Sequence, residues 1–167
     1  MKLIRKLNGI KTILSLLLIL TIMFINNVSY ADINRTQGQT VYLSLYPKIE
    51  GVGKRASTFL TTILTIRNTD LRHPITINSI DYYDSNGVLK RRVLKKPTII
   101  NPISSRSMRF EEKELAAENG MAGCFIIVWK SSEKVTEPIV EGIMGTSGTG
   151  WVSSSVFYGQ VIQDDSR

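Results

Sequence analysis

The sequence predicts an all-β protein, an immunoglobulin-like antiparallel β-sandwich of about seven or eight strands. Three observations support this prediction. Apolar and polar residues alternate with a period of two in many short segments, turn-forming residues separate these segments, and helical periodicity is nearly absent. A chain with this pattern packs two sheets face to face or closes into a barrel, so a small β-barrel is the alternative.

The segment 1–31 has the layout of a cleaved secretory signal peptide. A basic start leads into a short apolar run from Ile13 to Ile25, and small residues occupy Ser29 and Ala31. The run is too short for a bilayer, which needs about 20 residues. We therefore expect cleavage after Ala31, export to the periplasm or the extracellular space, and no stable membrane insertion after cleavage.

Residues 39–163 are predicted to form one domain, between a flexible lead-in at 32–38 and a polar tail at 164–167. Removing the signal leaves 136 of the 167 residues, enough for a single core. Four of the 21 basic residues leave with the signal while all 14 acidic residues stay, so the net charge falls from +7 to +3. This small charge offers little support for nucleic-acid binding, and we expect none.

The first predicted strand covers Gln39 to Tyr46, where valine and leucine alternate with tyrosine and serine. Residues 47–57 follow as a surface loop, because they include one proline, two glycines and three basic residues. The next strand, residues 58–67, alternates leucine and isoleucine with threonine. Asn68-Thr69-Asp70 then ends it, since short polar side chains favour turns.

Two strands, from Ile75 to Tyr83 and from Val88 to Leu94, are predicted to form a hairpin. Residues 84–87, with the sequence Asp-Ser-Asn-Gly, join them, and Asn-Gly tolerates the positive φ angles of a type I′ turn. Ile75 and Ile77 lie on the same face of the first strand, but Ile80, three residues after Ile77, would lie on the other face. A β-bulge near Asn78 and Ser79 is therefore expected, because it would turn all of them inward.

The remaining segments are mostly strands. Cys124 to Lys130 is apolar on both faces, which is typical of a strand in the middle of a sheet. The helix-prone segment, Glu112 to Asn119, spans at most two turns and ends at Gly120. The other predicted elements are a short extended piece at 98–100, strands at 104–111, 138–144 and 151–162, and a loop at 145–150.

Cys124 is the only cysteine, so an intramolecular disulfide cannot form. Its apolar strand indicates a small buried hydrophobe rather than a reactive thiol.

Four strings occur in this order along the chain: GQTVYLSLYPKI, LTIRNTD, PITINSIDYYDSNGVLKR and PIVEGIMGTSGTG. Together they resemble a family of exported bacterial proteins catalogued only as a domain of unknown function. The resemblance covers roughly residues 38–162, and its most specific parts are Asn68-Thr69-Asp70 and Asp81-Tyr82-Tyr83-Asp84 with Gly87. It implies an exported bacterial protein and brings no activity or catalytic residue with it.

No catalytic residue, metal site or cofactor is predicted. His73 is the only histidine and lies in a turn, and a Gly-x-Ser-x-Gly elbow is absent from the sequence. Beyond the signal, one histidine, one cysteine and three unclustered methionines make a poor set of transition-metal ligands. The oxygen-bearing residues at 81–86 do not have the spacing of a calcium-binding EF-hand loop.

A non-enzymatic module that binds another envelope or secreted protein is the leading hypothesis. Its candidate surface is a basic cluster with two tyrosines: Tyr82, Tyr83, Lys90, Arg91, Arg92, Lys95 and Lys96. The same basic residues would also protect an edge strand from aggregation. The alternative is a small-ligand or carbohydrate-binding module that uses a glycine-rich loop and a tryptophan: Gly145, Gly148, Gly150 and Trp151. The sequence indicates no oligomeric state.

Overall fold

The computed structural model describes residues 34–49, 58–111, 114–115, 122–148 and 151–164, together with Lys11, Leu14 and Ser15. The chain divides into two compact units, residues 1–33 and 34–167, and the second is described below. The predicted signal cleavage site lies outside the described residues. Within them, no helix has the length and apolar character needed to cross a membrane.

Twelve β-strands make up the described part of the second unit, which confirms the all-β prediction. They are β1 (Arg35–Leu45), β2 (Lys48–Ile49), β3 (Thr58–Phe59), β4 (Thr61–Arg67), β5 (Ile75–Asp84), β6 (Leu89–Arg92), β7 (Thr98–Ile100), β8 (Ser105–Phe110), β9 (Gly123–Thr136), β10 (Ile139–Gly148), β11 (Trp151–Tyr158) and β12 (Gln160–Asp164).

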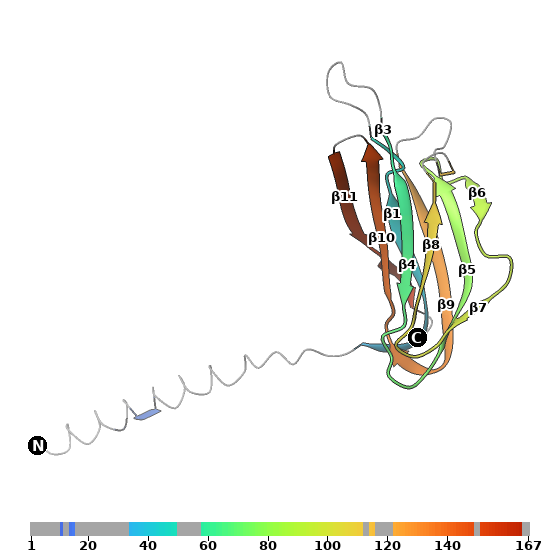
Figure 1. The fold of residues 1–167 in the computed structure, drawn as a ribbon. Helices are drawn as coiled ribbons and strands as arrows, with labels where there is room; N and C mark the ends of the chain where they lie inside the picture. The colour runs from blue at the N-terminus through green and yellow to red at the C-terminus, as the bar shows by residue number, and fades with distance from the viewer. Residues whose placement is uncertain are drawn as a thin grey trace, which may run out of the picture. The chain divides into compact units, whose positions relative to one another are not determined.

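The strands form two main antiparallel sheets (Figure 1). The six-stranded sheet has the order β12-β1-β9-β5-β6, with β7 also paired to β5, and the four-stranded sheet has the order β11-β10-β4-β8. A two-stranded ribbon, β2-β3, completes the set. The sheets pack as a β-sandwich and do not close into a barrel through any described strand, so the sandwich prediction is confirmed and the barrel alternative is wrong.

The core lies between the inward faces of the two sheets. Inward residues of β1, β5 and β9 meet those of β4 and β10, and the fully buried ones include Leu43, Leu45, Leu64, Ile66, Ile75, Ile77, Ile80, Phe125, Ile127, Trp129 and Met144. The sheets touch closely at Gly142, where an added Cβ would stand 3.2 Å from Leu43 Cδ2. β9 lies in the interior of its sheet, as its two apolar faces predicted.

The predicted bulge in β5 is confirmed, because the register against β9 shifts between Ile77 and Ser79. The predicted hairpin of β5 and β6 is also confirmed. Its turn differs from the predicted type I′, since only Gly87 has a positive φ, of 74°. A bond from the Gly87 N–H to the Asp84 carbonyl at 3.0 Å marks a type I turn followed by a left-handed glycine.

Three predicted boundaries are wrong, because polar strand residues show little apolar alternation. β1 begins at Arg35, so the predicted lead-in is strand from that residue onward. The buried Thr36 donates to Asp164 at 2.7 Å, which makes Asp164 part of β12 rather than of a tail. β9 continues through a polar stretch to Thr136. The predicted helix at 112–119 lies outside the described residues except at 114–115, which form a turn.

The C-terminal strand contributes to both sheets. Its first part, β11, pairs with β10, and its second part, β12, pairs with β1. Gly159 joins the two parts at a crowded corner, where an added Cβ would lie 2.5 Å from Val41 Cγ1. The sequence predicted one uninterrupted strand, because nothing in the apolar pattern marks the crossing.

Candidate functional site

The two tyrosines of the predicted binding surface point to opposite sides of β5. Tyr82 is 2% exposed, its ring meets Phe125 at 5.7 Å between centroids, and its hydroxyl donates to the Leu115 carbonyl. It therefore belongs to the core, and its assignment to a binding surface is wrong. Tyr83 lies on the outer face, half-buried, opposite Cys124 in the register.

Part of the basic cluster is engaged in ion pairs. β6 is an edge strand, as predicted, and its Lys90 and Arg91 form ion pairs with Asp84 at 3.3 Å and Glu114 at 3.1 Å. The remaining basic residues are exposed: Arg92 lies opposite Asp81 in the register, and Lys95 and Lys96 follow in the connection to β7. Neutralised charges at an edge suit protection from aggregation better than recognition of an acidic partner.

The predicted ligand loop is much shorter than expected. Gly145 and Gly148 belong to β10, where they are paired with Ser154 and Trp151 of β11. Their backbone is therefore part of a hairpin ladder and is not arranged as an open anion-binding loop. Gly150 and the side chain of Trp151 lie outside the described part of the chain.

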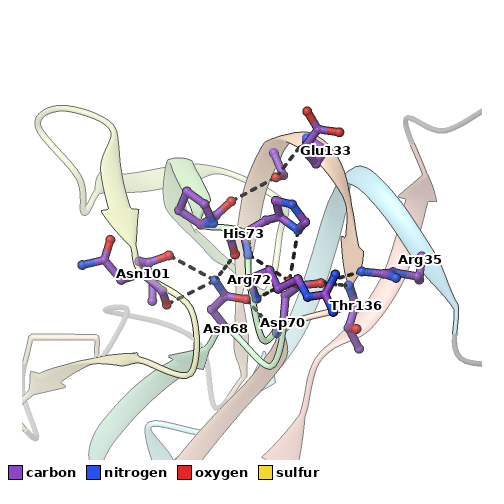
Figure 2. Close-up of polar contacts among 11 residues, drawn as sticks. Arg35, Asn68, Asp70, Arg72, His73, Asn101, Glu133 and Thr136 are labelled. Carbon is purple, nitrogen blue, oxygen red and sulfur yellow. Dashed lines mark hydrogen bonds and ion pairs between the residues drawn. The ribbon is translucent and has the colours of Figure 1, made fainter.

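A different feature stands out at the end of the sandwich where β4 finishes. Asn68 is buried there, and its Nδ2 donates to the carbonyl oxygens of His73 at 2.9 Å and of Ile100 and Asn101 at 3.2 Å each (Figure 2). Its Oδ1 accepts the N–H of Asp70 at 3.0 Å. One amide side chain thus joins the β4–β5 loop to the β7–β8 connection.

Asp70 is also buried, and its carboxylate joins further segments by hydrogen bonds. Its Oδ1 accepts the N–H groups of Arg72 and His73, both at 2.9 Å, and its Oδ2 accepts the N–H of Thr136 at 3.1 Å and Arg35 Nη2 at 3.0 Å. These donors, first of all the Arg72 N–H, hold the pKa of Asp70 well below its usual range against the opposing effect of burial. The carboxylate therefore stays ionised.

Thr69 completes the arrangement by donating from its hydroxyl to the Glu137 carbonyl at 2.9 Å. The Glu137 carboxylate in turn accepts hydrogen bonds from Asn34 and Gln39. We call Asn68, Thr69 and Asp70, with the groups that they bind, the loop network. It fixes the β4–β5 loop, the β7–β8 loop, the β9–β10 connection and the start of β1 against one another.

The loop network supports two exposed loop tips. Leu71 is 79% exposed and Ile103 is 64% exposed, and their loops are joined by a bond from the Ile103 N–H to the Asp70 carbonyl at 3.2 Å. Arg72 is exposed beside them. We call Leu71, Arg72 and Ile103 the tip surface. It borders a shallow hollow of about 280 Å³ lined by Arg67, Asn68, Thr69, Ile103, Ser104 and Ser105.

Ile103 has a φ of 54°, the only positive value at a described non-glycine residue. A β-branched side chain is strained in this left-handed region, and such strain is commonly kept at functional sites. An exposed apolar side chain on a strained backbone gains nothing from burial. The position is therefore costly for folding, which singles it out as a candidate for function.

Replacing Ile103 with glycine is expected to stabilise the protein by about 1 kcal/mol, because glycine adopts a positive φ without strain. The matched control is Ile99→Gly, at an equally exposed isoleucine in β7, where glycine should destabilise by about 1 kcal/mol. Thermal unfolding of both variants measures the two signs. A loss of stability in Ile103→Gly would contradict the strain.

Two side chains of types common in catalysis, His73 and Ser131, lie beside the loop network. His73 places Nδ1 3.3 Å from Asp70 Oδ1, but that carboxylate already accepts several other donors. The nearby Ser131 Oγ donates to the Pro74 carbonyl at 3.0 Å. No group of three or more histidine, cysteine, aspartate or glutamate side chains in the described ranges could hold a metal ion. Burial also raises the pKa of the Cys124 thiol, in keeping with its predicted structural role.

Sequence reasoning recognised Asn68-Thr69-Asp70 as a strand end and as a specific motif, but it missed the tip surface. The one available signal was Pro102, whose fixed φ favours a tight turn at 101–104. The positive φ at the following isoleucine has no sequence signature, because isoleucine is among the residues least suited to it.

Three comparisons relate the chain to known proteins. A family model described as "Protein of unknown function (DUF3124)" matches residues 38–162, a range that contains the tip surface and Asn68-Thr69-Asp70. No curated protein matches the chain. Among solved structures, the crystal structure of Thermotoga maritima 1070 is similar, with 15% identity, a TM-score of 0.41, and coverage of 76% of this chain and 97% of that chain.

Proposed function

Because this chain belongs to the DUF3124 family of unknown function, we propose its role from its surface: it is a non-enzymatic binding module of the bacterial cell envelope that docks another exported protein on the tip surface. The observation that carries this proposal is the pair of exposed apolar tips on loops fixed from beneath by buried polar groups. Binding residues are often presented in this way, on loops held by a rigid scaffold.

Rigid support matters for affinity. A loop that is already ordered loses little conformational freedom on binding, so more of the contact energy remains as affinity. Leu71 and Ile103 supply apolar area, and Arg72 adds a cation that has no ion-pair partner among the described residues. The tip surface therefore fits a protein partner with an apolar depression and a nearby carboxylate.

Export is supported by the segment 1–31, with its basic start, its short apolar run and the small side chains before Asp32. A non-enzymatic role is supported by the single histidine and by the saturated Asp70 beside it. A periplasmic or extracellular protein without catalytic groups acts through what it binds.

Crosslinking in cells of the native bacterium, followed by mass spectrometry, tests the proposal. The tagged wild-type chain should capture one recurrent envelope or secreted protein, and the Leu71→Ser/Ile103→Gly double variant should lose at least about nine-tenths of that capture. Because the glycine relieves strain, the loss would occur without loss of stability.

Two control variants locate the surface. Val88→Ser removes an exposed apolar residue from the β5–β6 turn, at the opposite end of β5, and should keep full capture. Lys95→Glu/Lys96→Glu reverses two exposed charges of the basic cluster and should also keep full capture. Loss of capture only in the lysine variant would transfer the function to the basic cluster, and absence of a recurrent partner for the wild type would overturn the proposal.

A further inference from the structure

The C-terminal strand forms an unprotected edge of the sandwich. β11 is the last strand of the four-stranded sheet and β12 the last of the six-stranded sheet, so no described strand covers their free side. Figure 1 shows β11, in dark red, at one edge of the fold. The stretch from Trp151 to Gln163 includes no charge and no proline. Natural edge strands normally carry such features, because they prevent pairing with another chain.

The other edges of the two sheets carry charged residues, except along β7, which also pairs with β5 and has only three residues. β6 carries Lys90, Arg91 and Arg92, and β8 carries Arg106 and Arg109, all of them exposed. Pairing either strand with its own copy would crowd these charged side chains against a second strand and disturb their ion pairs, which is unfavourable. Among the described edges of the two sheets, the one formed by β11 and β12 is therefore the most permissive toward a second copy of the same chain.

The ladder shows which backbone groups of β11 are free. The Gly159 N–H donates to the Val140 carbonyl at 2.8 Å, in continuation of the register that pairs Glu141 with Tyr158. Bonded and non-bonded pairs alternate in an antiparallel ladder, so every second residue from Gly159 backward bonds to β10. The residues between them direct their N–H and C=O groups to the open edge: Val152, Ser154, Val156 and Tyr158.

We propose that two copies of this chain associate through β11, antiparallel about a two-fold axis at Ser155, so that their four-stranded sheets join into one continuous sheet. This register pairs Ser154 with Val156 of the second copy and Val152 with Tyr158, and all four residues present free backbone groups. It also sets the outward side chains of Ser154 and Val156 opposite each other, as a continuous sheet requires. Val156 and Tyr158, 50% and 67% exposed, then contact the neighbouring copy.

A second copy is the occupant that the charges favour. In a two-fold dimer, β11 of one copy pairs with β11 of the other. The predicted mature chain carries a net charge of +3, but β11 carries no charge, so the two paired strands do not repel each other. The tip surface plays no part in this contact. The inference therefore stands or falls independently of the proposed partner protein.

Light scattering during size-exclusion chromatography of the protein expressed from the full chain, over a range of concentrations, is the first test. The wild type should have the mass of a dimer. Val156→Lys places a positive charge from each copy in the proposed contact. It should raise the dissociation constant of the dimer roughly 100-fold or more. Ser154→Pro, which removes only a free N–H, should weaken the dimer in the same way. The control Ile99→Lys adds the same charge to β7 and should leave the dimer intact.

Cysteine crosslinking tests the register. Ser155→Cys should form an intermolecular disulfide on oxidation, because the two copies of a residue on the axis face each other within about 5 Å. Ser154→Cys is the control, since its two copies lie on a diagonal at roughly 7 Å or more and should crosslink poorly. If circular dichroism shows that Val156→Lys does not fold, the test of the dimer contact depends on Ser154→Pro and on the two cysteine variants.

Three outcomes would overturn the inference. The first is a wild type that is monomeric at all concentrations tested. The second is a dimer that persists in folded Val156→Lys and Ser154→Pro alike, or that crosslinks no better at 155 than at 154. The third is a monomer that acquires a stoichiometric foreign protein, lost in Ser154→Pro, which would assign the edge to a strand from another chain.

Discussion

Replacing Asn68 with alanine is expected to lower the free energy of unfolding by about 3–5 kcal/mol. The substitution removes three donated hydrogen bonds and one accepted bond at a buried position. The carbonyl oxygens of His73 and Ile100 and the N–H of Asp70 would lose this partner together, and the Asn101 carbonyl would keep the Ser104 N–H. Urea unfolding of the variant measures the effect.

Asn101→Ala is the matched control for this expectation. Asn101 lies in the same network, but its side chain is exposed and only its backbone carbonyl accepts from Asn68. The control should stay within about 0.5 kcal/mol of the wild type. Equal losses in the two variants would show that the loop tolerates no substitution and that the Asn68 amide has no special role.

Replacing Asp70 with asparagine is expected to destabilise the protein by about 2–4 kcal/mol at neutral pH. The amide can still accept from the N–H groups of Arg72 and His73, but its NH₂ group would face two donors, the Thr136 N–H and Arg35. Two donors facing each other form no bond. The buried position gives the side chain little room to turn away.

The pH dependence of this variant follows from the lowered pKa of Asp70. A carboxylate with a depressed folded-state pKa stabilises the fold fully above its unfolded value, near 3.8, and this contribution is lost as the pH falls through the folded value. The wild type should therefore lose stability as the pH drops below about 5, and the difference from Asp70→Asn should shrink.

Thermal unfolding between pH 7 and pH 3 provides the measurement. Glu133→Gln, which removes the same charge from an exposed position near the network, should follow the wild type throughout. A difference between wild type and Asp70→Asn that stays constant across this range would show that the Asp70 charge does not stabilise the fold.

Local patterns in the sequence predicted most of the fold. Ile77 and Ile80 of β5 are an odd number of residues apart. This spacing predicted the bulge after Ile77, because only an extra residue brings Ile80 to the inner face. The two apolar faces at 124–130 predicted the interior place of β9. Both features depend on residues that are neighbours in sequence, and this is where periodicity is informative.

Features made by distant residues were not predictable in this way. Asn68 binds carbonyls 32 and 33 residues away, and Asp70 binds an N–H 66 residues away, so the sequence showed only a turn at a place where the structure has a network. Tyr82 was assigned to a surface because an aromatic pair fits either face of a strand. The polar residues that lengthen β1 and β9 have no apolar period that would mark them as strand.

The pairing of β1 with β12 also has a consequence for the order of folding. Gln39 lies opposite Asp164, near the far end of the chain, and the other side of β1 pairs with β9. Contacts at this separation carry a large loop-closure entropy and form slowly. The first strand cannot complete its hydrogen bonding until the ribosome has finished the last one. The chain thus stays incompletely folded until β12 has been synthesised.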